Sequence, residues 1–272
     1  MNKGKTALLL VLTLVVGLLS MACGDSNSSD NKQEQRIYLL GEYEHSNPDM
    51  LDQIYAWWDY FYHEKGMRHY FCEDSYYGAA FLNLWIKADN DDILNQLYDD
   101  WEGTQAHSPF MLEFYKKIKE NCPETIFHGT DVGHQYDSTG ERYLKYLEDN
   151  EMKDSEEYAL TLESIEQGKT FYDTRYNESD YDGFKYREEK MTENFLRELN
   201  SIGKNESVFG SYGGGHTEMF SESWYDYVDP GTGNLPFDCM TVRLRKYLCE
   251  RLNVIQLYEY HEILPLRETE SK

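Results

Sequence analysis

The stretch RIYLLGEYEHSNPDMLDQIYAWWDYFYHEKG, residues 36–66, combines a short apolar run with a helical pattern. Residues 36–40 form the apolar run, and a glycine ends it, which is typical of a buried strand. Ser46 or Asn47 then caps a helix that has Pro48 in its first turn. Aromatic and aliphatic residues recur at helical spacing until the last glycine of the stretch, which is a suitable stop signal. The stretch therefore predicts a strand that leads directly into a helix.

The same alternation of strand and helix continues along the chain. Further strands are expected at residues 69–72, 125–128, 207–210 and 254–258. Helices are expected at about 76–87, 91–101, 109–120, 183–200 and 239–251, with two polar helices within 139–168. Residues 169–182 and 221–238 are rich in polar and turn-forming residues and predict loops. This order favours an α/β fold with a mostly parallel central sheet and helices on both faces. We expect one domain at 36–262 and a C-terminal tail at 263–272.

The N-terminus has the layout of a secretory signal. Two lysines precede an apolar run at residues 7–19, which is too short to span a bilayer comfortably. A small residue directly before Cys23 resembles a bacterial lipobox, in which residues 1–22 are cleaved and the cysteine is lipidated. The alternative is a plain signal peptide with an incidental cysteine. Residues 23–35 are polar and predict a flexible tether. The expected location is the bacterial cell envelope, outside the cytoplasm, with a lipid anchor in the membrane.

Charge excludes one class of partner. The chain has 50 Asp and Glu residues against 26 Lys and Arg residues, for a formal net charge of −24. Nucleic-acid binding requires a basic surface that neutralises phosphates, and no such stretch is present. Anionic lipid head groups also repel an acidic chain. We therefore expect no nucleic-acid partner, and contact with the bilayer only through the N-terminal lipid.

Four further cysteines follow the tether. Outside the cytoplasm they could form disulfides, and four cysteines allow three pairings. The spacing does not choose among these pairings. No Cys-x-x-Cys motif occurs, so a zinc knuckle or a thioredoxin-like site has no support. These cysteines are Cys72, Cys122, Cys239 and Cys249.

Ionisable residues follow four of the expected strands. They are Glu42 and His45 after the first strand, Glu73 after the second, Asp131 after the third and His216 after the fourth. In parallel sheets, active groups lie in the loops beyond the carboxyl ends of the strands. A neutral imidazole can take a proton from water, and a carboxylate can orient its ring. The same residue types could instead cap helices or occupy exposed turns.

A divalent metal is a second interpretation of these residues. His45, Glu73 and His216 are the candidate ligands, because imidazole and carboxylate groups bind such ions and leave positions open for substrate. Motifs for other chemistries are absent. Ser211 does not lie in a Gly-x-Ser-x-Gly elbow, and there is neither a His-Glu-x-x-His motif nor a phosphate-binding glycine loop.

One helix carries polar residues at positions that share a face. Arg187, Met191 and Asn194 have this spacing. A cation, a thioether and an amide on one face suit the wall of a pocket. Arg187 could pair with a carboxylate or bind an anionic group, or it could form an ion pair with a neighbour on its own helix. We expect Asn194 and Asp131 to contact the substrate.

Five motifs occur here in the order found in erythromycin esterase-like proteins. They are Gly-Glu-x-x-His, a Glu after the second strand, Gly-x-Asp, Arg-x-x-x-Met-x-x-Asn and Gly-x-x-His. The chain resembles this group over about residues 37–260, and the group is related to the haem-binding ChaN proteins and the Tiki/TraB-like proteins. The resemblance implies an esterase in which His45 activates water without a bound metal. Glu42, Glu73, Arg187 and His216 would complete the polar cluster.

The resemblance also limits the substrate. The chain is shorter than typical macrolide esterases, and Ser46 follows His45 where those enzymes usually have glycine, which argues against a macrolide. The implied function is hydrolysis of an ester or a lactone in a small-molecule substrate, with no cofactor. The alternative is a non-catalytic uptake lipoprotein of the ChaN type that binds haem or a metal. A third possibility is a degenerate pocket on a protein that binds a protein partner.

Overall fold

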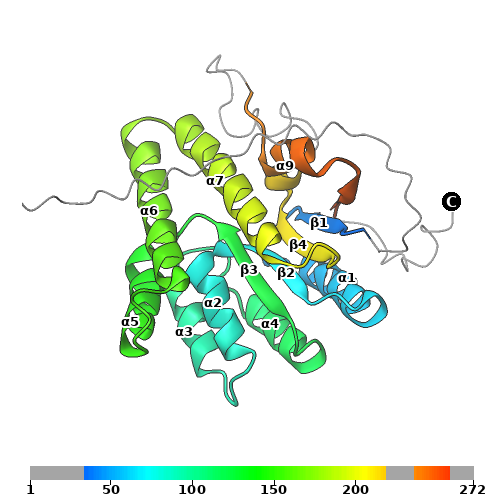
Figure 1. Ribbon diagram of the computed structural model, residues 1–272, viewed down its shortest axis with the longest axis horizontal. Coiled ribbons are helices and arrows are strands. Elements are labelled where there is room, and N and C mark those ends of the chain that lie inside the picture. The colour runs from blue at the N-terminus through cyan, green and yellow to red at the C-terminus, as the bar shows by residue number, and fades with distance from the viewer. Residues whose placement is uncertain (1–33, 219–235, 258–272) are drawn as a thin grey trace, which may run out of the picture. The chain divides into compact units, whose positions relative to one another are not determined.

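Five parallel strands form a central sheet in the order β3-β2-β4-β1-β5 (Figure 1). The computed structural model describes residues 34–218 and 236–257, which belong to one unit of the chain. The strands are β1 (Ile37–Glu42), β2 (His69–Ser75), β3 (Ile126–Asp131), β4 (Val208–Gly213) and β5 (Leu252–Gln256). Since all five run in the same direction, their carboxyl ends meet at one edge of the sheet.

Eight α-helices accompany the sheet in the described part of the chain, apart from short turns. They are α1 (Pro48–Lys65), α2 (Tyr76–Trp85), α3 (Asp92–Asp100), α4 (Pro109–Asn121), α5 (Glu141–Asp149), α6 (Glu156–Asn177), α7 (Asp180–Ser201) and α9 (Met240–Leu248), with a π-helical turn at Tyr136–Gly140 before α5. Short turns also follow β4 at Gly214–Thr217 and precede β5 at Cys249–Arg251.

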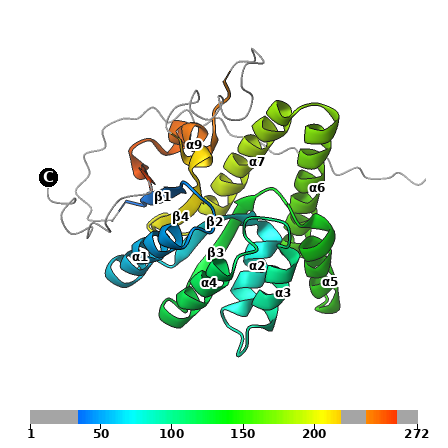
Figure 2. The same ribbon diagram turned by 180° about the vertical axis from the view of Figure 1, so that it is seen from behind.

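Helices cover both faces of the sheet, because side chains alternate between the faces along each strand. On β1, Ile37 and Leu39 pack with α7 and α9, whereas Leu40 packs with the cluster under α1, α2 and α4. On β2, Phe71 faces α7, and Tyr70 faces α1. Figures 1 and 2 show α1, α2 and α4 on one side of the strands and α7 and α9 on the other. The prediction of a mostly parallel sheet with helices on both faces is confirmed.

The first strand and helix form as their sequence predicts. Asn47 is the N-cap of α1, and its side chain accepts hydrogen bonds from the backbone N–H groups of Asp49 and Met50. Pro48 occupies the first turn, where it has no hydrogen bond to lose. Gly66 ends the helix with φ 69°, a left-handed conformation that glycine adopts without steric cost. Strand and helix are therefore joined by only the few residues that contain His45.

One loop prediction is wrong. Residues 169–182 were expected to be a loop, but α6 continues to Asn177, and α7 begins at Asp180. The buried face of α6 includes Thr161, Ser164 and Gly168. Because this face contains few apolar residues, helical periodicity of hydrophobicity does not reveal it.

Several expectations lie outside the described residues. They are the signal at 1–22, Cys23, most of the tether, most of the loop at 221–238 and the tail at 263–272. Within the described ranges, no helix is both long enough and apolar enough to cross a bilayer. Of the cysteines, Cys72, Cys122 and Cys239 are buried thiols outside any disulfide.

Candidate active site

The turn between β1 and α1 holds the first pair of site residues. His45 Nδ1 lies 2.5 Å from Glu42 Oε1, and Glu42 is largely buried. The hydrogen bond that His45 donates to Glu42 raises the pKa of His45 to about 9, against the opposing effect of burial. Ser46 follows with φ 57°, and its hydroxyl donates to the backbone carbonyl of Gln105 at 2.6 Å. This left-handed residue turns the chain so that the His45 ring stays beside the carboxyl end of the sheet.

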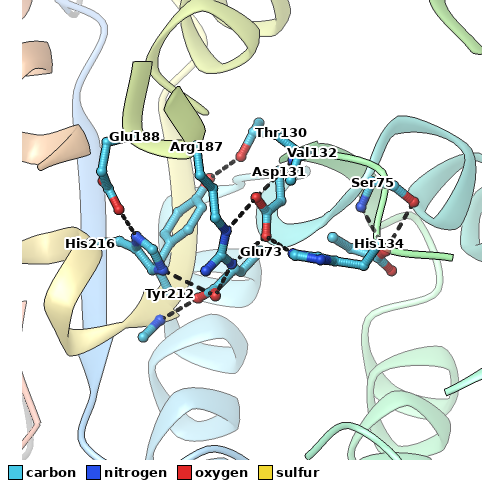
Figure 3. A network of polar contacts seen from close by, with 12 residues as sticks. Glu73, Ser75, Thr130, Asp131, Val132, His134, Arg187, Glu188, Tyr212 and His216 are labelled. Atoms are coloured by element: carbon cyan, nitrogen blue, oxygen red, sulfur yellow. Dashed lines mark hydrogen bonds and ion pairs between the residues drawn. The ribbon is translucent and has the colours of Figure 1, made fainter. Parts of the chain in front are cut away.

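Arg187 lies between the buried carboxylate of Asp131 and the largely buried carboxylate of Glu73 (Figure 3). Its Nε donates to Asp131 Oδ1 at 2.9 Å, and its Nη2 donates to Asp131 Oδ2 at 2.5 Å. Nη2 also donates to Glu73 Oε1 at 2.7 Å, and Glu73 Oε2 accepts from the backbone N–H of Gly213 at 2.6 Å. Burial alone would raise the pKa of each carboxyl, but neighbouring cations hold both pKa values below the usual range. Arg187 was expected to pair with a carboxylate or to bind an anionic group. In the structure it pairs with two carboxylates, those of Glu73 and Asp131.

His216 lies behind Glu73 and is almost completely buried. Its Nε2 lies 3.3 Å from Glu73 Oε1, and its Nδ1 contacts Glu188 Oε1. Although burial opposes the charged form, Glu188 and Glu73 together raise the pKa of His216 to about 10. The other oxygen of Glu188 accepts from the backbone N–H of Met240 at 2.7 Å, at the start of α9. His216 is therefore an imidazolium between two carboxylates, and it holds Glu73 in place.

His134 and Tyr172 join the site, although neither was among the predicted site residues. His134 Nε2 lies 3.1 Å from Asp131 Oδ2, and its Nδ1 lies 2.9 Å from the Tyr172 hydroxyl. Gly168 of α6 lets the helix approach this loop, because a Cβ there would lie 1.8 Å from the Gly133 carbonyl oxygen. The sequence signal for His134 was its position three residues after Asp131. Tyr172 belongs to a tyrosine-rich segment, predicted to be a loop, whose tyrosines could either line a substrate cleft or only cover the surface.

Asp74 is a further acidic residue of the site. It follows Glu73 at the end of β2, where the register with β3 shifts between Cys72 and Ser75. Such irregularities redirect side chains at the end of a strand. Burial raises the pKa of Asp74 to about 6, although hydrogen bonds from Ser75 oppose this shift. Asp74 is thus a carboxyl that gains or loses a proton near neutral pH.

Asn194 does not lie with the other predicted residues. Its side-chain amide donates to the Thr130 backbone carbonyl at 3.1 Å and to Gln167 Oε1 at 2.8 Å. Gln167 returns a hydrogen bond to Asn194 Oδ1 at 3.1 Å. Both side chains are buried. Asn194 therefore joins α7 to α6 and to β3, and Met191 of the same face lies in the core.

A cavity of about 350 Å³ opens at this edge of the sheet. Its polar wall consists of residues from the strand ends, from α7 and from the loop after β3. These residues are Glu42, His45, Glu73, Asp74, Asp131, His134 and Arg187. His216 and Glu188 are not among the lining residues, in agreement with their position behind Glu73. The volume is within the range of sites for small molecules, about 300–1,000 Å³.

The proposed metal ligands do not form one coordination site. Both ring nitrogens of His216 face carboxylates, so neither has a lone pair for an ion. Among the described residues, one group of three side chains has its ligand atoms within 4.8 Å of one another, and it lies away from the cavity on α1 and at the end of α4. This group is Asp59, His63 and Cys122.

Comparisons with known proteins support the fold. No family model matches the chain, and neither does any curated protein. A Bacillus cereus protein of known structure is 16% identical, with a TM-score of 0.54, and a succinoglycan biosynthesis protein is 13% identical, with a TM-score of 0.52. A mutant of the erythromycin esterase EreC in its open conformation is 12% identical, with a TM-score of 0.54.

These similarities extend over most of the chain but not over the whole of the other proteins. Each covers 82% of this chain. The chain spans 65% of the length of the first two proteins and 69% of the esterase. At such low identity, the similarity concerns the fold alone. The chain thus has an erythromycin esterase-like α/β fold.

Proposed function

We propose that this protein is a hydrolase that cleaves an ester or a lactone in a small molecule. The observation that carries the proposal is the His45 ring, which Glu42 orients at 2.5 Å beside a cavity of small-molecule size. A histidine held by a carboxylate is the usual arrangement for a general base. The fold shared with an erythromycin esterase supports the same reaction class.

In the proposed reaction, neutral His45 takes a proton from water while the water oxygen bonds to the carbonyl carbon. The carbonyl π electrons move to oxygen, and the resulting tetrahedral oxyanion then collapses. The bond to the leaving alkoxide breaks, and the proton on His45 passes to that alkoxide. The products are a carboxylic acid and an alcohol, or one hydroxy acid from a lactone. Glu42 stabilises the transient imidazolium, and the ion pairs of Arg187 keep Glu73 and Asp131 in fixed positions.

The location of the protein in the bacterial cell is part of the same proposal. The lipobox-like sequence around Cys23 and the polar tether support a lipid-anchored protein of the bacterial cell envelope that faces away from the cytoplasm. In that position, the enzyme would meet esters that reach the membrane surface from outside. Mass spectrometry of the protein from bacterial membranes tests this part. An N-terminal acylated cysteine at position 23 supports it, and an intact residue 1 contradicts it.

The hydrolysis test compares wild-type protein with His45→Ala and with the control His63→Ala. His63 is an exposed histidine of α1 outside the cavity. A panel of p-nitrophenyl esters and aliphatic lactones serves as substrate. We expect His45→Ala to lower kcat/KM at least a hundredfold and His63→Ala to leave it unchanged, because general-base catalysis contributes about 10²–10⁴-fold. Equal activity of the two variants contradicts the proposal, and a haem Soret band that depends on His45, without hydrolysis, assigns the site to haem capture.

A further inference from the structure

The cavity has a second half, which does not contain the charged groups. It continues from the strand ends into the space between the sheet and the helices α1 and α4. Its wall there is mainly aliphatic and aromatic. The lining residues are Leu51 and Ile54 from α1, Met111, Phe114 and Tyr115 from α4, and Trp101 and Ala106 from the segment between α3 and α4. All of them belong to, or pack against, the core cluster on this face of the sheet.

Polar atoms on the strand side of this second half are already hydrogen-bonded within the protein. The hydroxyl of Tyr70 on β2 lies 2.6 Å from Ser211 Oγ on β4, and each can satisfy the other. The Cys72 thiol lies 3.5 Å from the His128 backbone carbonyl, to which it donates. A ligand that enters this half therefore needs no polar group to pair with these three side chains. A non-polar group is favoured in this half of the cavity, because a polar group without a hydrogen-bond partner there has a desolvation cost.

The depth of the cavity follows from the strand that forms its floor. Both Glu73 and Tyr70 line it, and they are three residues apart on β2. At about 3.3 Å per residue, this separation is roughly 10 Å. An extended alkyl chain with C–C bonds of about 1.5 Å advances roughly 1.3 Å per carbon. Measured from Glu73 beside the polar wall to Tyr70, the cavity therefore has room for an unbranched chain of about eight carbons, the carbonyl carbon included.

We infer that the substrate is an ester with one unbranched, medium-length apolar arm, which lies between the sheet and helices α1 and α4 while its carbonyl group lies beside His45. This inference rests on the proposed hydrolase function and adds the class of substrate. Burial of each methylene contributes about 0.8 kcal/mol, which corresponds to about a fourfold change in binding. Chain length should therefore dominate the choice among simple esters.

The kinetic test uses the full-length chain in detergent with p-nitrophenyl esters of two, four, six, eight and twelve carbons. We expect kcat/KM to rise up to fourfold per methylene until about eight carbons and to fall at twelve. Ala106→Leu fills the second half, and we expect it to lower kcat/KM for the octanoate at least tenfold more than for the acetate. Ala80→Leu is the matched control, because Ala80 packs on the same core without lining this cavity.

A binding test makes the outcome independent of catalysis. Calorimetry compares 1-octanol with 1-butanol in wild-type protein and in Ala106→Leu. We expect octanol to bind wild type at least tenfold more tightly than butanol, and Ala106→Leu to abolish this preference. Such binding without hydrolysis of any ester supports the apolar subsite and contradicts the hydrolase. Hydrolysis without dependence on chain length supports the hydrolase and overturns the subsite, and equal effects of Ala106→Leu and Ala80→Leu also overturn it.

Discussion

The charge state of His45 is the residue-scale property on which the proposed chemistry depends. Glu42 and Glu73 both favour the imidazolium and bring the pKa of His45 to about 9. A general base must be neutral before it accepts a proton from water. If His45 is the base, kcat/KM should therefore rise about tenfold per pH unit toward pH 9 and then level off. Stopped-flow or plate-based rates between pH 5 and 10, corrected for hydrolysis without enzyme, measure this profile.

Two variants in the same turn sharpen this prediction. Glu42→Gln removes the charge that raises the pKa of His45, so the rising limb should move about 1–2 units toward lower pH. Glu44→Gln is the control, because Glu44 is exposed and its carboxylate contacts Asn47 rather than His45. A profile that is flat between pH 6 and 9 would contradict the assignment. It would make Asp74, whose pKa is about 6, the base and His45 the acid.

Arg187 should matter more for stability than a typical surface cation. Its replacement by Met removes the guanidinium that contacts both Glu73 and Asp131, and the loss of one partner from a buried ion pair costs about 3–5 kcal/mol. Arg36→Met is the control, since Arg36 is exposed and lies 3.9 Å from Glu34. We expect the control to change the free energy of unfolding by less than about 1 kcal/mol. Urea denaturation measures the free energy of unfolding of both variants. Similar losses of stability in Arg187→Met and Arg36→Met would show that Arg187 does not stabilise buried charges.

At the residue scale, the sequence predicted the positions of site residues at strand ends more accurately than the positions of residues on helices. His45, Glu73 and Asp131, which lie at or after strand ends, all line the cavity. The reason is topological, because parallel strands bring the residues after them to one edge. Glu188 was not predicted, since its contact with His216 depends on how α7 is rotated over the sheet. Asn194 was predicted to contact substrate, but the same rotation directs it toward Gln167.

At the scale of elements, the turn from β1 to α1 combines a backbone strain with a compensating contact. Ser46 has φ 57°, and its hydroxyl bonds to the Gln105 carbonyl. Ser46→Gly and Ser46→Ala both lose this bond, but only alanine keeps the unfavourable left-handed conformation. We expect the glycine variant to be more stable than the alanine variant by about 1 kcal/mol. Thermal denaturation measures the difference, and an equal or higher stability of the alanine variant would exclude a positive φ at this position.

Helix α6 shows why some elements were not predictable. The strands and most helices were located correctly because one face of each is apolar. The buried face of α6 instead contains Thr161, Ser164 and Gln167, which bond to neighbouring backbone or side chains or pack closely. Their burial depends on which groups of α7 and of the loop after β3 contact them. Local periodicity carries no information about those partners.

At the scale of the whole molecule, the buried charges predict how stability depends on pH. The pKa of His216 rises from 6.5 to about 10 on folding because of Glu188 and Glu73, against burial and Arg187. The charge of His216 therefore makes its full contribution to the free energy of unfolding below pH 6.5, and this contribution decreases as the pH rises toward 10. Folding lowers the pKa values of Glu73 and Asp131. Their negative charges therefore stabilise the folded state above about pH 4.5, and this stabilisation decreases in acid. We expect maximal stability between about pH 5 and 6.5.

Urea denaturation between pH 4 and 9 tests this dependence. The upper limit avoids the titration of buried tyrosines and thiols, which lose protons at higher pH. In Glu188→Gln, the imidazolium of His216 loses one of its two anionic partners. The decrease of stability from pH 6.5 to 9 should then become shallower, whatever the absolute stability of the variant. An unchanged slope would mean that His216 does not gain its charge from this contact.

The strand order also determines when the fold can be completed. β1 lies between β4 and β5, and Ile37 pairs with Val208 and Leu252. At about 5–20 residues per second, synthesis needs roughly 10–35 s to make the 170 or so residues that separate β1 from its first neighbour. Throughout this interval, the apolar first strand has two unpaired edges. A nascent chain that stops before β4 should therefore aggregate rather than form a smaller domain, and the newly made chain depends on protection from self-association until its last quarter is complete.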